Sequence, residues 1–165
     1  MQSQQWEQWK KEIKLLEKVI IDRCFPPSGF GQIIDSSLHH FSDASCDAYG
    51  QASYIRLIDT AGNISIKLVM SKSRVAPPKR PTIPRLELTA AVLSVKITNS
   101  LHNELDILIT NEYFWTDSQV VLAYISNEVK RFHLFVSNRI KFIRENSALD
   151  TYHPRKILQT TPKED

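Results

Sequence analysis

The chain has 165 residues, of which 42% are hydrophobic and 24% charged, and its formal net charge is +3 at pH 7. This length and composition predict one folded domain and exclude a disordered or fibrous protein. No apolar run approaches the roughly 20 residues that a membrane span needs, and Cys24 and Cys46 are too few for a disulfide framework. We therefore expect an intracellular protein, cytoplasmic or nuclear, that has no membrane partner.

The amino-terminal segment carries an amphipathic pattern. Its apolar residues recur every three or four positions, which predicts a helix with one apolar stripe that ends before Pro26. The stripe consists of Trp6, Trp9, Ile13, Leu16 and Ile20. Because two tryptophans are rarely exposed on an isolated helix, we expect the stripe to pack on this domain or on a missing neighbour.

Three short segments rich in apolar and β-branched residues follow a loop that we expect over residues 26–37. They cover residues 38–41, 51–58 and 64–70, and this composition predicts strands. The sequence Asp-Thr-Ala-Gly-Asn at residues 59–63 contains several turn-forming residues. It predicts an antiparallel hairpin between the second and third strands.

The second half of the chain alternates helices and strands. Four prolines between Pro77 and Pro84 predict a loop, and Pro84 suits the first turn of a helix that ends near His102. The later elements that we expect are a strand at residues 113–115 and helices at residues 118–125 and 132–143. This order predicts the α/β class, with a mixed sheet and flanking helices in one domain.

Three acidic residues interrupt apolar or small segments: Asp43 in FSDAS, Glu87 in PRLEL and Asp117 in WTDS. A carboxylate within a buried element is costly unless it is paired or binds a cation. Taken singly, Asp43 is explained as a turn acid, Glu87 as a solvated helix residue and Asp117 as a helix N-cap. As a set they could converge above one sheet, and carboxylates without His or Cys partners favour Mg²⁺ or Mn²⁺.

Five sequence motifs occur in the order and approximate spacing of one family. They are Phe41–Ser45 with Ala48-Tyr49-Gly50, Lys72–Pro77, Ile83–Leu88, Trp115–Ser118 and Val136–Arg139. With these motifs the chain resembles the ribonuclease H domain of Pao (BEL-type) LTR retrotransposons from Trp6 to about Asn146. The resemblance implies a mixed five-stranded ribonuclease H-like sheet at residues 38–148. It also implies that residues 1–37 connect this domain to the reverse transcriptase of the parent polyprotein.

The resemblance further implies an endonuclease that hydrolyses the RNA strand of RNA–DNA hybrids with two divalent ions, Mg²⁺ or Mn²⁺, held by four acids. Three acids map onto this chain: Asp43 would bridge both ions, Glu87 would hold one, and Asp117 would help to position the pair. Ser45 and Ser118 flank these acids and could contact phosphate or cap helices. Several basic residues near the Glu87 helix would hold phosphates, although a solvated loop explains them equally well. They are Lys72, Arg74, Lys79, Arg80 and Arg85.

The end of the chain departs from the family. The family's fourth acid closes the pattern Val-Pro-Ser/Thr-Lys-Glu-Asn-Pro-Ala-Asp, whereas residues 151–160 read TYHPRKILQT. Synonymous codons can encode these residues in one reading frame and the family pattern in a shifted frame. We therefore hypothesise a frameshift shortly before Thr151, and a gene that uses other codons there would contradict it. Glu164 and Asp165 are not credible replacements because no element positions them.

Three expectations follow from this departure. Residues 149–165 should form an aberrant, disordered tail, the last strand-and-helix segment should be incomplete, and cleavage should be impaired because the fourth acid is missing. Two rival classes stay open. One is a non-catalytic remnant or scaffold that binds nucleic acid, and the other is a different metal-dependent nuclease or transposase of the same general fold.

Overall fold

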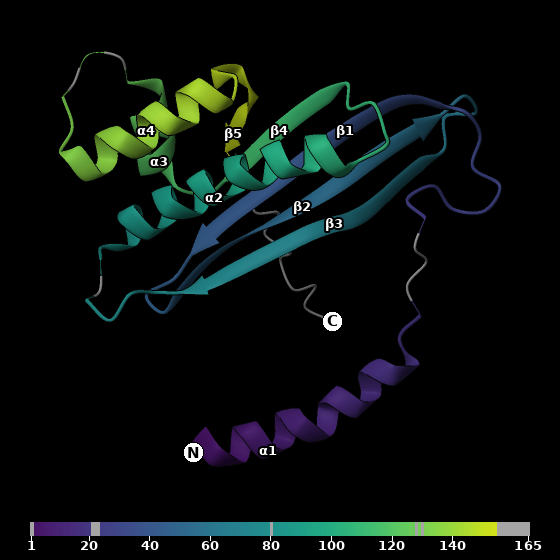
Figure 1. Cartoon of the computed structure of the whole chain (residues 1–165), viewed down its shortest axis with the longest axis horizontal. Helices are drawn as coiled ribbons and strands as arrows, with labels where there is room; N and C mark the ends of the chain where they lie inside the picture. The colour runs from purple at the N-terminus through teal and green to yellow at the C-terminus, as the bar shows by residue number, and fades with distance from the viewer. Residues whose placement is uncertain (1, 21–23, 80, 128, 130, 155–165) are drawn as a thin grey trace, which may run out of the picture.

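A five-stranded sheet forms the centre of the domain (Figure 1). The computed structural model describes residues 2–20, 24–79, 81–127, 129 and 131–154. In spatial order the strands are β3 (Ile64–Val75), β2 (Ala48–Asp59), β1 (Ile33–Ala44), β4 (Asn111–Thr116) and β5 (Tyr152–Pro154). The β1–β2 and β2–β3 pairs are antiparallel, while β1–β4 and β4–β5 are parallel. The predicted mixed α/β sheet is confirmed, and its first three strands form an antiparallel meander.

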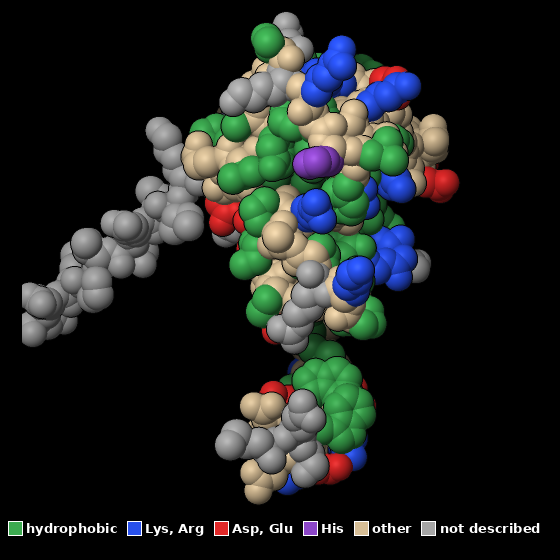
Figure 2. Space-filling view, turned by 90° about the vertical axis from the view of Figure 1, so that its left-hand side faces the viewer, with side chains coloured by type: hydrophobic (Ala, Val, Ile, Leu, Met, Phe, Trp, Pro, Cys, Tyr) green, Lys and Arg blue, Asp and Glu red, His purple; other side chains and the backbone are tan. Residues whose placement is uncertain are grey.

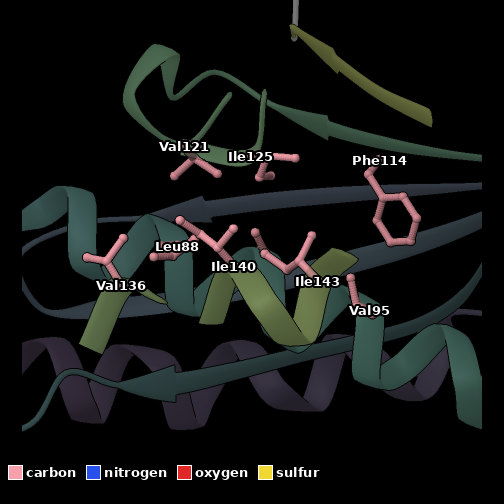
Figure 3. Packing of buried hydrophobic residues seen from close by; sticks show 9 residues of the cluster. Leu88, Val95, Phe114, Val121, Ile125, Val136, Ile140 and Ile143 are labelled. Carbon is pink, nitrogen blue, oxygen red and sulfur yellow. The ribbon is translucent and has the colours of Figure 1, made fainter. Parts of the chain in front are cut away.

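Three helices pack together on one face of this sheet (Figure 1). They are α2 (Ile83–Glu104), α3 (Gln119–Ser126) and α4 (Leu134–Asn146). Every second residue of β2 from Gln51 to Asp59 is buried, because alternate side chains of a strand point to the same face. Figure 3 shows the larger apolar cluster, in which side chains of α2, α3, α4 and β4 meet. The core thus lies between the sheet and these helices.

The first strand begins earlier than the sequence predicts. Residues 33–37 belong to the predicted loop, whereas β1 starts at Ile33 and pairs with β2 from there. Ser36 and Ser37 favoured the loop prediction because serine is common in turns. In the structure they are buried in the strand, with 1% and 2% of their surface exposed. The expected domain boundary between residues 37 and 38 therefore falls inside a continuous strand.

The end of the described chain also differs from the expectation. The sequence predicts disorder from residue 149, but Leu149–Thr151 form the short 3-10 helix η2 and Tyr152–Pro154 form β5. The Tyr152 ring stacks on Phe114 at 4.9 Å, and its hydroxyl lies 3.0 Å from Ser147 Oγ. Burial raises the pKa of the Tyr152 phenol. Pairing with β4 and the packing of Tyr152 therefore hold the segment. Residues 155–165, with Glu164 and Asp165, lie outside the described residues.

The amino-terminal helix lies apart from the sheet (Figure 1). It comprises α1 (Gln2–Ile13) and the 3-10 helix η1 (Lys14–Lys18). Trp6 and Trp9 stack on each other at 5.0 Å and are 56% and 51% exposed. The amphipathic helix is therefore confirmed. Its stripe does not pack on this domain, and docking on a neighbour stays a prediction.

The β2–β3 turn is built around one buried carboxylate. Asp59 accepts hydrogen bonds from the backbone N–H groups of Gly31, Ala61 and Asn63 at 2.8–2.9 Å and from the Asn63 side-chain amide at 2.9 Å. Gly62 has φ +81°, a left-handed conformation that glycine adopts without strain. The hairpin predicted from residues 59–63 is confirmed, and the same carboxylate also attaches the loop before β1.

These hydrogen bonds predict how stability depends on pH. The Asn63 side-chain amide, followed by the Gly31 N–H, lowers the pKa of Asp59 from 3.8 to about 2. A lowered pKa in the folded state stabilises the protein above the unfolded-state pKa, and this contribution is lost as the pH falls from about 5 towards 2. We expect Asp59→Asn to lower the melting temperature at pH 6. Near pH 2 the melting temperatures of the variant and the wild type should be similar. Circular dichroism melts would test this, with exposed Asp106→Asn as the control. Parallel pH profiles for wild type and Asp59→Asn would contradict it.

Candidate active site

Two of the three predicted acids lie at the same end of neighbouring parallel strands. The β1–β4 register pairs Phe41 with Trp115. Asp43 and Asp117 each follow two residues beyond this last pair, near the carboxyl ends of the two strands. Both side chains are exposed. This end of the sheet is thus where the main chain presents two carboxylates together.

The third acid lies on α2, beside the residue that follows Asp117. Glu87 lies in the second turn of the helix and is half-buried. Ser118, which directly follows Asp117 and is 5% exposed, donates a hydrogen bond from Oγ to Glu87 Oε2 at 2.6 Å. The same Oγ accepts the Val121 N–H at 3.2 Å and so caps α3. Ser118 therefore performs the capping role considered from the sequence, in place of Asp117, and it also orients Glu87.

The fit of these residues to a divalent cation has two sides. Mg²⁺ and Mn²⁺ prefer oxygen ligands, and carboxylates supply them. Within the described part of the chain, however, no group of three or more His, Cys, Asp or Glu side chains is close enough to hold a metal ion. The donor chemistry of Asp43, Glu87 and Asp117 fits the cation, but their side chains are not gathered into one ligand cluster.

Asp43 opens onto a shallow pocket on the sheet face opposite α2. The pocket is lined by Phe41, Asp43, Ser45 and Tyr54 among others. Ser45 stabilises the β1–β2 turn, since its Oγ accepts the N–H groups of Asp47 and Ala48 at 3.2 Å. A role of Ser45 towards phosphate therefore stays a prediction.

Aromatic rings continue this open face across β1, β4 and β5. His39 stacks on Tyr113 at 4.9 Å and Phe41 on Trp115 at 6.1 Å, and Trp115 lies 5.1 Å from His153. The Trp115 indole N–H donates to His39 Nδ1 at 3.2 Å. Burial, followed by the nearby Arg56 charge, lowers the pKa of His39. These contacts favour a neutral imidazole in the aromatic row.

The predicted basic residues do not form a single loop. Lys72 and Arg74 lie on β3, opposite Gln51 and Tyr49 of β2. Arg85 is on α2 and Lys79 lies between the two elements, whereas Arg80 lies outside the described residues. Figure 2 shows the side of the domain where α2 begins, and Lys and Arg side chains are spread widely over it with few acids among them. The predicted basic residues therefore come from a strand, a loop and a helix.

One further cation at this end was not among the site residues predicted from sequence. Arg139 of α4 is half-buried and lies against the first turns of α2, where its Nε donates to Thr89 Oγ1 at 3.2 Å. The Val136–Arg139 motif marked this segment but indicated no role for the guanidinium. Only the packing of α4 on α2 brings the Arg139 guanidinium next to the turns of α2 that contain Glu87.

The strand order, the helices on one face and the acids at the ends of β1 and β4 define a ribonuclease H-like α/β domain. The family model described as the Pao retrotransposon-like RNaseH-like domain matches residues 1–118. The chain belongs to this family. The match includes Asp43, Glu87 and Asp117, whereas the Val136–Arg139 motif lies beyond it.

Solved structures with a similar arrangement include ribonuclease H1 from Halobacterium salinarum, with 15% identity, coverage of 72% of this chain and 80% of that chain, and a TM-score of 0.43. The amino-terminal ribonuclease H domain of a Mycobacterium tuberculosis protein is 9% identical, and the match covers 73% of this chain and 82% of that chain with a TM-score of 0.43. Prototype foamy virus protease-reverse transcriptase has 16% identity and a TM-score of 0.43 over 88% of this chain and 20% of that chain. No curated protein matches the chain. Among the described helices, none is long and apolar enough to cross a membrane.

Proposed function

We propose that this chain is a ribonuclease H-type domain that binds RNA–DNA hybrids and divalent cations, and that its hydrolysis of the RNA strand is impaired. One arrangement carries the proposal. Asp43 and Asp117 lie near the carboxyl ends of adjacent parallel strands, and Glu87 is hydrogen-bonded to the residue that follows Asp117. The family membership supports the same activity.

Each acid would have a separate task. Asp43 would contact two ions, Glu87 would hold one of them, and Asp117 would help to position the pair. Bound Mg²⁺ or Mn²⁺ would supply an activated water and neutralise charge on the leaving oxygen. Ser118 keeps one oxygen of Glu87 hydrogen-bonded, which limits the rotation of that carboxylate before any ion binds.

The substrate would be held mainly by its backbone. Lys72 and Arg74 on β3, Lys79 after it and Arg85 on α2 would supply the positive charge for phosphate contacts, with Arg80 as a further basic residue of this segment. Phosphate contacts position a duplex without reading its sequence, and 2′-hydroxyl groups distinguish the RNA strand. We therefore expect little sequence preference.

A second candidate function is a non-catalytic domain that binds nucleic acid. It is favoured by the absence of a cluster of three ligating side chains in the described residues. It is also favoured by the missing counterpart of the fourth acid. In either case, residues 1–37 would connect the domain to the reverse transcriptase of a parent polyprotein, and the exposed Trp6 and Trp9 could contact that neighbour.

The test is cleavage of an RNA–DNA hybrid, labelled on the RNA, in Mg²⁺ and in Mn²⁺. We expect the 165-residue chain to bind the hybrid and to cleave it weakly or not at all. A variant in which Val-Pro-Ser-Lys-Glu-Asn-Pro-Ala-Asp replaces residues 152–160 should cleave it. Asp43→Asn in that variant should reduce the rate by about 100-fold or more, the scale seen when one preorganised electrostatic group is removed. Asp106→Asn, another exposed aspartate, is the matched control.

The outcomes separate the two candidates. Binding without cleavage by either version would favour the non-catalytic domain. If the unaltered chain cleaves the hybrid strongly and Asp43→Asn abolishes this cleavage, the proposed impairment would be refuted. The proposed role of Asp43 in the active site would stand. Cleavage that Asp43→Asn does not change would refute the assignment of Asp43.

A further inference from the structure

Two guanidinium groups from different helices share one aromatic ring. The Cζ atom of Arg139, on α4, lies 3.5 Å from the centroid of the Phe135 ring, and that of Arg85, on α2, lies 5.3 Å from it. Both distances fall within the roughly 6 Å over which a cation is attracted to an aromatic face. Two positively charged groups, which repel one another, therefore both lie within cation–π distance of one ring.

The guanidinium of Arg139 is fixed in orientation. Its Nε donates to Thr89 Oγ1 at 3.2 Å and its Nη1 donates to the Phe135 carbonyl at 3.1 Å. The Thr89 hydroxyl in turn donates to the Arg85 carbonyl at 2.7 Å. Partial burial lowers the pKa of Arg139. A rigid, partly dehydrated guanidinium interacts with an anion more strongly than a solvated one does.

In the part of the chain that the structure describes, no carboxylate forms an ion pair with Arg85 or Arg139. Among the described residues, Arg139 Nη2 has no hydrogen-bond acceptor. Arg144, on the same helix, is different. Its Nε and Nη2 donate to the Ile125 carbonyl and its Nη2 also donates to the Asn127 carbonyl, at 2.7–3.2 Å. Arg144 thus ties α4 to the end of α3, whereas Arg139 keeps donors available.

We propose that Arg139 and Arg85 form a phosphate-binding pair that holds the backbone of the nucleic acid beside the acids. The proposal rests on the proposed function and adds Arg139 to its site. Arg85 and Thr89 flank Glu87 within the first two turns of α2, and the amino-terminal end of a helix favours anions. An Arg fork can contact two phosphate oxygens at once, which suits a phosphodiester better than an isolated ammonium group does.

The competing explanation is that Arg139 only ties α4 to α2. Binding of a fluorescent RNA–DNA hybrid of about 16 base pairs in EDTA, where metal-dependent cleavage is prevented, separates the two roles. We expect Arg139→Gln to weaken binding about 10-fold and to lower the salt dependence by the equivalent of about one phosphate contact. Arg139→Lys should lose part of the affinity for the hybrid, because lysine keeps the positive charge but not the two parallel N–H donors of the guanidinium. The control is Lys141→Gln, which removes one charge from an exposed, Glu145-paired side chain of the same helix and should change binding by less than about 2-fold.

A second measurement does not depend on how well a variant folds. In the wild-type chain, the side-chain N–H resonances of Arg139 should shift when the hybrid is added. The inference would be overturned if the Arg139 resonances do not move when the hybrid binds. It would also be overturned if Arg139→Gln and Lys141→Gln bind the hybrid equally well. In both cases the proposal that the chain binds the hybrid would stand. Absence of hybrid binding by the wild-type chain would overturn the proposed function and this inference together.

Discussion

Replacing Leu88 with alanine should lower the free energy of unfolding by about 3 kcal/mol, within the range measured for buried leucines. Leu88 is 0% exposed on α2 and belongs to the cluster that contains Val121, Ile140 and Ile143 (Figure 3). The substitution removes apolar contacts and leaves a cavity that the packed helices cannot fully close. Alanine is a good helix former, so the loss would come from packing.

Urea unfolding followed by circular dichroism would measure this effect. Leu134→Ala is the matched control, because Leu134 lies at the start of α4 and is 75% exposed. We expect it to change stability by no more than about 0.5 kcal/mol, with an unchanged denaturant slope for both variants. Equal losses for the two leucines would mean that α2 does not pack against α3 and α4 as described.

His40→Ala should produce a loss of similar size, about 3 kcal/mol, through a polar network. The imidazole is 0% exposed and stacks on Phe114 at 4.9 Å. Its Nδ1 lies 2.8 Å from Ser53 Oγ, and its Nε2 lies 3.0 Å from Thr98 Oγ1 and 3.1 Å from Glu112 Oε1. Alanine would remove the ring from the core and leave the buried Thr98 hydroxyl without this partner.

The neighbouring His102 separates this network from a general effect of histidine removal. His102 Nε2 lies 3.5 Å from the same Glu112 oxygen, but its side chain is 45% exposed. We expect His102→Ala to cost no more than about 0.5 kcal/mol at neutral pH. A His40→Ala protein as stable as the His102→Ala protein would show that the contacts between β1, β2, α2 and β4 do not depend on His40.

Local signals in the sequence accounted for much of the architecture. The turn residues at 59–63 predicted the hairpin, and apolar spacing predicted α2, α3 and α4 to within a few residues. It also predicted α1, although neither end of that helix was placed accurately. The strand ends were predicted less well. Residues 33–37 and 71–75 of β1 and β3 contain Ser, Lys and Arg, whose burial or exposure depends on neighbouring strands and helices.

The candidate site shows the same division. Residue types and short motifs are enough to identify Asp43, Glu87 and Asp117 as candidates, yet their spacing along the chain does not specify how the three meet. The parallel pairing of β1 with β4 determines that the strand ends near Asp43 and Asp117 are neighbours. The Ser118–Glu87 hydrogen bond, between residues 31 positions apart, depends on how α2 packs beside the start of α3.

By itself, the sequence determined the α/β class, the order of its elements, the family resemblance and the three candidate acids, because periodicity, turn chemistry and short motifs are local properties. Only the tertiary structure decided that Tyr152 brings β5 onto β4, that the Trp6 and Trp9 stripe stays exposed, and that Arg139 joins Arg85 on Phe135. These outcomes depend on contacts between elements that are distant in sequence. Side-chain packing, rather than local preference, selects such contacts.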